Sequence, residues 1–145
     1  MSYIESALAG SDAIDANWLI GADKFIMFGA ADSLDSDATT GKFVIPTESY
    51  REEGFSYHYA SPADYIKIKN SDMVKSIFDE LKLPSVQGKV WTTDAIYRET
   101  TAKLDARKSE GCIAVEMELA GVQAVCDFYG WELYDFLVTG DVLDQ

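Results

Sequence analysis

Two carboxylates flank a methionine where a predicted buried strand gives way to a predicted helix. Glu116, Met117 and Glu118 occupy this junction in the stretch GCIAVEMELAGVQAVC, residues 111–126. A carboxylate in the first turn of a helix is stabilised by free N–H groups and the helix dipole, which is one interpretation of Glu118. Alternatively, a fixed carboxylate accepts hydrogen bonds from two neighbouring hydroxyl groups of a sugar, at ~1.5–3 kcal/mol for each bond to a charged acceptor. Met117 would then pack against the apolar face of that sugar.

A third acidic residue, Asp141, follows the predicted last strand in the stretch ELYDFLVTGD. Aspartate beside glycine is typical of turns, which gives Asp141 a purely structural interpretation. Its catalytic interpretation is a general acid that protonates a leaving heterocycle. That role requires a raised pKa, so we expect Asp141 to be partly buried if it has this role.

Strand and helix patterns alternate along the chain. Apolar runs predict strands over residues 24–29, 42–46, 86–94, 112–117 and 132–141, with the first buried and the second stopped by Pro46. Helix patterns cover residues 11–23, 71–83, 98–111 and 118–129, and residues 49–62 are expected to be extended. This alternation predicts an α/β fold, one domain over residues 1–145, with a parallel or mixed sheet covered by helices on both faces.

In such sheets, ligands bind at the carboxyl ends of the strands. This rule points to Ala30 after the first strand, to the Glu116–Glu118 pair, and to Asp141 after the last strand. The acidic junction therefore lies where a binding site is expected.

Charge and composition exclude several classes of partner. Asp and Glu total 25 against 12 Lys and Arg, a formal net charge of -13, so nucleic acid and anionic membranes would be repelled. No apolar run approaches the ~20 residues needed to cross a bilayer, and no signal peptide is evident, so we expect a cytoplasmic location. Cys112 and Cys126 are expected to be reduced core residues, and a single histidine, His58, is too little for a zinc site.

Several stretches, taken in order, resemble the nucleoside phosphorylase superfamily, which includes purine nucleoside and uridine phosphorylases and the related nucleosidases. They are FGAADSL, GKFVIP, EGFSYHY, TTDAIYRET, GCIAVEMELAGV and GDVLDQ, and they span the chain from about Gly10 to Gln145. The resemblance implies a three-layer α/β/α fold around a mixed sheet that partly closes into a barrel. It also implies cleavage of the N-glycosidic bond of a nucleoside, by phosphate in the phosphorylases and by water in the nucleosidases, with no cofactor.

The resemblance assigns roles residue by residue. Glu118 would bind the ribose hydroxyls, Met117 would line the sugar, and Glu116 would face the base or support the site. Ile96 occupies the position after TTDA that often carries a base-stacking aromatic. Asp141 matches the aspartate that protonates the purine in purine-type members, so a purine nucleoside is the expected substrate and phosphate the expected co-substrate.

The sequence also departs from the family pattern around the phosphate. Met27 stands where many phosphorylases have arginine, Ala30 where serine or threonine is common, and Asp32 where glycine is typical. We expect the family's N-terminal segment and its helix after the last strand to be missing from these 145 residues. We expect an open sheet edge that favours a homo-oligomer. The alternatives are a phosphate-independent nucleosidase, a catalytically weak nucleoside-binding or scaffold relative, and an α/β domain whose acidic residues are only helix caps.

Overall fold

A computed structural model describes residues 5–143 of the chain. Its helices are α1 (Glu5–Ile20), α2 (Ser36–Thr39), α3 (Ser71–Glu80), α4 (Thr101–Ser109) and α5 (Leu119–Tyr129), with 3-10 turns at Phe55–His58 and Ile96–Arg98. Its strands are β1 (Lys24–Ser33), β2 (Phe43–Glu52), β3 (Tyr65–Lys67), β4 (Ser85–Thr93), β5 (Cys112–Glu116) and β6 (Glu132–Val142). Within this range, no helix is long and apolar enough to cross a membrane.

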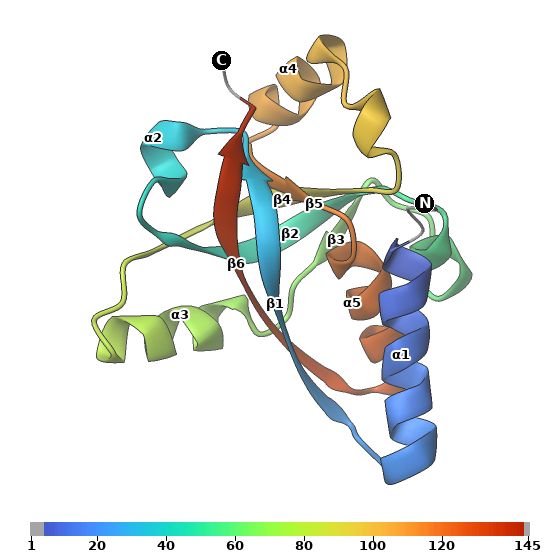
Figure 1. Ribbon diagram of the computed structural model, residues 1–145. Coiled ribbons are helices and arrows are strands. Elements are labelled where there is room, and N and C mark those ends of the chain that lie inside the picture. Colours follow the sequence, from blue (N-terminus) through green and yellow to red (C-terminus); the bar gives the residue numbers. More distant parts are fainter. Residues whose placement is uncertain (1–4, 144–145) are drawn as a thin grey trace.

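The strands form one mixed sheet that closes on itself. Its order is β3-β2-β4-β5-β1-β6, and a further pairing of β2 with β6 closes five of the strands into a barrel, with β3 added outside. β1 runs parallel to β6, and β4 runs parallel to both β2 and β5, whereas the β1–β5, β2–β3 and β2–β6 pairs are antiparallel. The mixed, partly barrel-like α/β sheet expected from the sequence is therefore confirmed (Figure 1).

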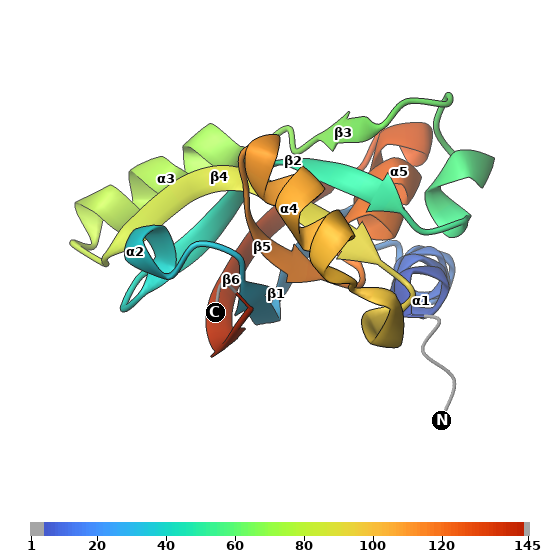
Figure 2. The ribbon, with the colours of Figure 1, turned by 90° about the horizontal axis from the view of Figure 1, so that it is seen from above.

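Helices surround this sheet. α1 and α5 lie side by side at one end of it and α3 at the other (Figures 1 and 2). The contact between α1 and α5 is close: an added Cβ at Gly121 would stand 2.9 Å from the carbonyl oxygen of Ser6. α1 thus packs on α5, which in turn carries the junction that holds Glu118.

The main core lies between the barrel strands and α5. It combines strand residues such as Val44, Val90 and Leu137 with Leu119 and Cys126 of α5, all buried. Cys112 is buried in a second cluster beside Trp91. Both cysteines are free and buried, as expected.

Two strands differ from the sequence-based expectation. β1 continues to Ser33 through residues expected to form a loop, and it is not buried: Ile26 is 71% exposed and Phe28 is 70% exposed. Pro46 does not stop β2, which continues to Glu52; its ladder with β4 shifts register between Pro46 and Ser49. Such an irregularity tolerates a proline because the residue there need not donate to the ladder.

The ends of other helices and strands also differ from those expected from the sequence. α1 begins at Glu5, well before the expected start at Ser11. The segment expected to be extended forms strand only to Glu52 and then a 3-10 turn at Phe55–His58. Asp141, expected at the end of the last strand, lies within β6, which continues to Val142.

Candidate functional site

The corner between β5 and α5 is built on Glu116. This residue ends β5, and its side chain is buried, with the residue only 4% exposed. One carboxylate oxygen accepts the backbone N–H groups of Glu118, at 2.6 Å, and Leu119, at 2.7 Å, while the Thr92 hydroxyl donates to the other. Burial raises the pKa of Glu116 to about 7, and these three hydrogen bonds oppose the rise.

Glu116, rather than Glu118, therefore caps α5. Glu118 occupies the position just before the helix, but its side chain makes no capping bond. Its side chain accepts a long bond, 3.3 Å, from the N–H of Met117 and shares a hydrogen bond with the Glu5 carboxyl. The purely capping interpretation of Glu118 is wrong, because its neighbour already satisfies the first N–H groups of the helix.

The half-buried carboxyl of Glu118 faces two adjoining cavities. The acidic cavity, of about 170 Å³, lies between the β5–α5 corner, the start of α1 and the end of β1. Its lining residues are Glu5, Ala30, Ala31, Asp32, Ile96, Glu99, Val115, Met117 and Glu118. The β1 cavity, of about 370 Å³, continues along β1 and shares Glu5, Ala30 and Glu118 with the first.

Four of the six residues singled out from the sequence line the acidic cavity: Glu118, Met117, Ile96 and Ala30. They come from three separate parts of the chain and meet because the barrel brings the end of β1 next to the end of β5. Met117 is held in place by its carbonyl oxygen, which accepts a hydrogen bond from the Ser6 hydroxyl at 2.8 Å. Glu116 lies beneath the cavity rather than in its lining.

Asp141 stands apart from this group. It is exposed and belongs to neither cavity's lining, so the free chain does not give it the partial burial expected of a general acid. Its backbone N–H nevertheless donates to Asp32, which does line the acidic cavity. Burial, together with the charge of Asp141, raises the pKa of Asp32.

Two acidic residues of the cavity were missed by sequence reasoning, Glu5 and Glu99. Glu5 precedes the helix pattern that we recognised, and Glu99, which the sequence placed in a charged surface helix, stands between a turn and α4. Burial raises the pKa of Glu99 to about 7, with the charges of Asp32 and Glu52 adding to the rise and Lys103 opposing it. Burial and a hydrogen bond to the Glu5 carboxyl raise the pKa of Glu118, and the charge of Glu116 adds to this.

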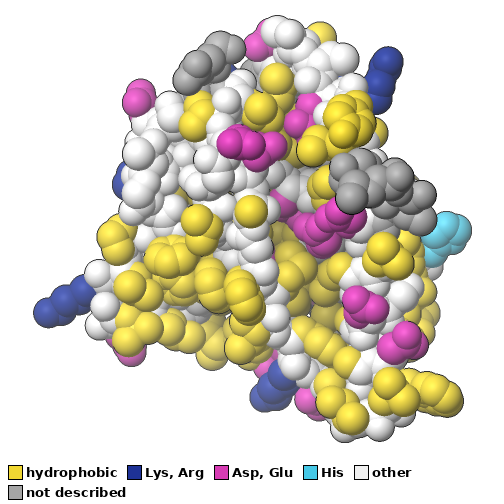
Figure 3. Space-filling model, in the orientation of Figure 1, with side chains coloured by type: hydrophobic (Ala, Val, Ile, Leu, Met, Phe, Trp, Pro, Cys, Tyr) yellow, Lys and Arg dark blue, Asp and Glu magenta, His cyan; other side chains and the backbone are white. Residues whose placement is uncertain are grey.

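Among residues 5–143, carboxylates are the only charged groups that line the two cavities, and no Lys, Arg or His is among the lining residues. Lys103 lies outside the lining of both cavities and forms an ion pair with Glu52. Figure 3 shows acidic side chains gathered beside the hollow between β1 and α1. The described residues also include no group of three potential ligands that would hold a metal ion.

A further carboxyl, that of Asp135, is enclosed in the barrel near this site. It is 1% exposed, and neither oxygen has a hydrogen-bond partner among the described residues. Burial raises its pKa well above the ordinary value, and the charges of Glu116 and Glu118 add to the rise. The alternation of β6 could have revealed it, because Asp135 stands between the inward-facing Leu133 and Leu137.

The chain matches the Phosphorylase superfamily over residues 5–145. It is 33% identical over 129 residues to an uncharacterized protein of Acanthamoeba polyphaga mimivirus, across 86% of this chain and 48% of the other. It is 25% identical over 124 residues to the DeoD-type purine nucleoside phosphorylase of Colwellia psychrerythraea, across 83% of this chain and 53% of the other. The chain thus spans about half the length of the curated relatives it matches.

The fold is similar to that of a solved structure, AMP nucleosidase from Bacteroides thetaiotaomicron. The TM-score is 0.81 at 21% identity, across 94% of this chain and 61% of that one. At this level of identity the likeness concerns the fold alone.

Proposed function

This chain belongs to the phosphorylase superfamily, and from that premise we propose that it binds a nucleoside at the acidic cavity and supports cleavage of its N-glycosidic bond. The observation that carries the proposal is the position of Glu118. Its carboxyl makes no capping hydrogen bond, is half-buried, and lines a cavity together with Met117, Ile96 and Ala30. A purine nucleoside is the favoured substrate because the named relatives include a purine nucleoside phosphorylase.

Glu118 has the chemistry to hold the sugar. In its ionised form, which its raised pKa shifts to higher pH, Glu118 accepts hydrogen bonds from two neighbouring ribose hydroxyls, and Met117 gives the sugar an apolar surface. When the glycosidic bond breaks, positive charge develops on the sugar. A carboxylate in a half-buried cavity interacts more strongly with that charge than with the neutral ground state, which lowers the barrier. Ile96 supplies an apolar contact for the base.

The leaving base needs a proton. We assign this role to Asp141, following the family pattern, with Asp32 as its partner. Asp141 is exposed in the free chain, whereas Asp32 lines the cavity and has a raised pKa. Comparing Asp141→Asn with Asp32→Asn separates them: the variant of the true acid loses base release, and the other retains most of it. Unchanged release in Asp141→Asn would contradict our assignment.

The nucleophile that the lining favours is water. Phosphate is the co-substrate expected from the family, but an anion entering this cavity meets Glu5, Asp32, Glu99 and Glu118, and no cation among residues 5–143 lines it. In hydrolysis, the oxygen of water bonds to the anomeric carbon, and the bond from that carbon to the base nitrogen breaks. The base leaves with the electron pair and takes up a proton, while a carboxylate such as Glu99 accepts the proton that water loses.

The test is an assay for free base. The purified chain is incubated with inosine, adenosine or methylthioadenosine, with and without phosphate, and the products are separated by chromatography. We expect release that does not require phosphate and that falls at least ~100-fold in Glu118→Ala, because a group that stabilises the transition state is lost. Glu80→Ala, which changes an exposed glutamate at the end of α3, is the matched control.

Release only with phosphate would support phosphorolysis. A chain that binds nucleoside through Glu118 without releasing base would be a binding protein rather than an enzyme. This outcome is measured by calorimetric titration of the same nucleosides into the wild-type chain and Glu118→Ala. Equal affinity in both proteins would contradict the proposed site.

A further inference from the structure

The long strand β1 has one paired edge and one edge that is mostly open. Along Lys24–Ala31 it pairs with β6, whereas β5 joins its other edge only at Asp32 and Ser33. Residues 24–31 therefore have no strand partner on that second edge within the part of the chain that the structure describes. A row of unpaired N–H and C=O groups is a template for another strand.

A groove runs along this open edge, between β1 and α1. Its outer part is a cavity of about 240 Å³, lined by Ala9, Asp12, Ala13 and Ala16 of α1, by Phe25, Ile26 and Met27 of β1, and by Val122 and Leu133. This cavity shares Ala9 and Met27 with the β1 cavity, which shares Glu118 with the acidic cavity. The groove therefore continues from the middle of α1 to the candidate functional site.

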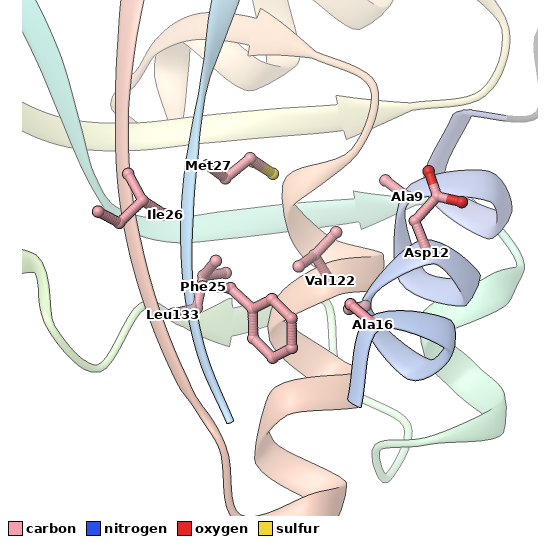
Figure 4. Close-up of a pocket in the computed structure, with 9 residues that line it drawn as sticks. Ala9, Asp12, Ala16, Phe25, Ile26, Met27, Val122 and Leu133 are labelled. Atoms are coloured by element: carbon pink, nitrogen blue, oxygen red, sulfur yellow. The ribbon is translucent and has the colours of Figure 1, made fainter. Parts of the chain in front are cut away.

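The groove has the shape and chemistry for an extended peptide. Its α1 side presents three alanines, so the helix leaves space for a backbone beside β1. In Figure 4, Phe25 and Met27 point from β1 toward α1 and α5, while Ile26 points to the other side of the strand. An added strand would present apolar side chains alternately to these two sides, as in strand addition to other open sheet edges.

Charge indicates what kind of polypeptide fits. The groove carries Asp12 along its length and ends at Glu5 and Glu118, with no basic residue in the lining of the three cavities. A second copy of this chain carries the same net charge of -13, and its own β1 edge lies beside its own α1. A basic segment of a different protein is the better match.

We infer that the open edge of β1 is the docking site for an extended segment of a second, different polypeptide, with an apolar residue at every other position and a basic residue at its end. The segment adds to β1 as a strand within the groove and places a lysine or arginine near Glu5 and Glu118. Its presence would form a further wall of the nucleoside cavity.

The test uses a fluorescent synthetic peptide, Lys-Thr-Val-Thr-Val-Thr-Val-Lys, and the whole chain. A control peptide of the same length has prolines at the second and third valines, because proline cannot complete a strand ladder. Fluorescence anisotropy measures binding, and hydrogen–deuterium exchange followed by mass spectrometry locates it. We expect saturable binding of the first peptide, at least ~10-fold weaker binding of the second, and slower exchange in residues 24–31.

Ala16→Phe, which fills the groove from α1, should weaken binding at least ~10-fold. Leu8→Phe, at an exposed α1 position outside the three cavities, should leave it unchanged. Absence of binding, equal binding of the proline peptide, or protection elsewhere, such as at the apolar groove beside Ile77 and Phe136, would overturn the inference. So would slow exchange of residues 24–31 in the free chain that is lost on dilution, because a second copy would then be the occupant. None of these readouts depends on base release.

Discussion

At the scale of single residues, the carboxyl groups of Glu116 and Glu118, only two positions apart, have different roles. Glu116 is buried and accepts three hydrogen bonds from the corner that it stabilises. Glu118 makes no capping bond and faces a cavity. The difference arises because the strand ends between them: Glu116 is the last residue of β5, whereas Glu118 follows the bend into α5, so the two side chains no longer share one strand face. The strand-to-helix corner thus separates a structural acid from one that is free to meet a ligand.

These different roles of Glu116 and Glu118 predict effects of different size on stability when each is replaced by alanine. Glu116→Ala should lower the free energy of unfolding by about 2–4 kcal/mol, because it leaves two helix N–H groups and the Thr92 hydroxyl without their acceptor. Glu118→Ala should change it by less than about 1 kcal/mol, since it removes no capping bond. Urea denaturation followed by circular dichroism measures both. Equal destabilisation by the two variants would contradict the separation of duties.

Asp135 gives a prediction about pH. Because burial raises its pKa, the folded chain holds this proton at pH values where the unfolded chain has released it. The folded state thus binds more protons between the ordinary pKa of about 4 and the raised one, so stability falls as pH rises through that window. Asp135→Asn keeps the shape without the ionisation, and its stability should fall less steeply, by up to about 1.4 kcal/mol per pH unit.

Urea denaturation of both proteins between about pH 5 and pH 8 measures the two slopes. The variant should retain part of the fall, because the raised pKa of Glu116 contributes in the same direction. Parallel curves for wild type and variant would show that Asp135 does not hold a proton in the folded chain.

At the scale of elements, the sequence predicted the β4, β5 and α5 segments well, because continuous apolar runs and helical spacing are strong local signals there. It misjudged β1 and β2. The first half of β1 alternates between exposed and half-buried residues because it borders an open groove, which no local pattern shows. Pro46 normally ends a strand, but the register shift beside it is a property of the pairing with β4.

The same distinction applies to the site. Glu118, Met117, Ile96 and Ala30 were found because they stand in recognisable motifs at the ends of strands. Glu5 and Glu99 were missed because only the packing of α1 on α5 and the turn before α4 bring them to the cavity. Local sequence patterns predict the lining residues at the ends of strands, whereas the positions of Glu5 and Glu99 depend on tertiary contacts.

The α1–α5 contact gives a prediction at this scale. Replacing a helix glycine by alanine usually stabilises a helix by about 1 kcal/mol. At Gly121, however, the added Cβ would stand 2.9 Å from the backbone oxygen of Ser6, which cannot rotate away. Gly121→Ala should therefore destabilise the chain by about 1–3 kcal/mol. Gly54→Ala is the control, because no heavy atom lies within 4 Å of its added Cβ, and thermal unfolding compares the two. A neutral Gly121→Ala would mean that α1 is not pressed against α5.

At the scale of the whole molecule, charge decides which ligands can approach. The net charge of -13 surrounds a cavity that is itself lined by carboxylates. The long-range field and the local site therefore act in the same direction, against anions. Screening weakens this field over a Debye length of about 10 Å at ~0.1 M salt, so the repulsion depends on ionic strength.

We therefore predict that AMP binds more weakly than adenosine, although the two share base and ribose. A phosphate within several ångströms of exposed carboxylates costs about 1–2 kcal/mol, which corresponds to an affinity lower by roughly 5- to 30-fold at low salt. Raising the salt from about 0.02 M to about 0.5 M should narrow the difference, because the repulsion is screened while the hydrogen bonds to Glu118 are little affected. Isothermal titration at both salt concentrations measures the ratio. If AMP binds at least as well as adenosine at low salt, a cation must reach the bound phosphate, and hydrolysis by water would lose its main support.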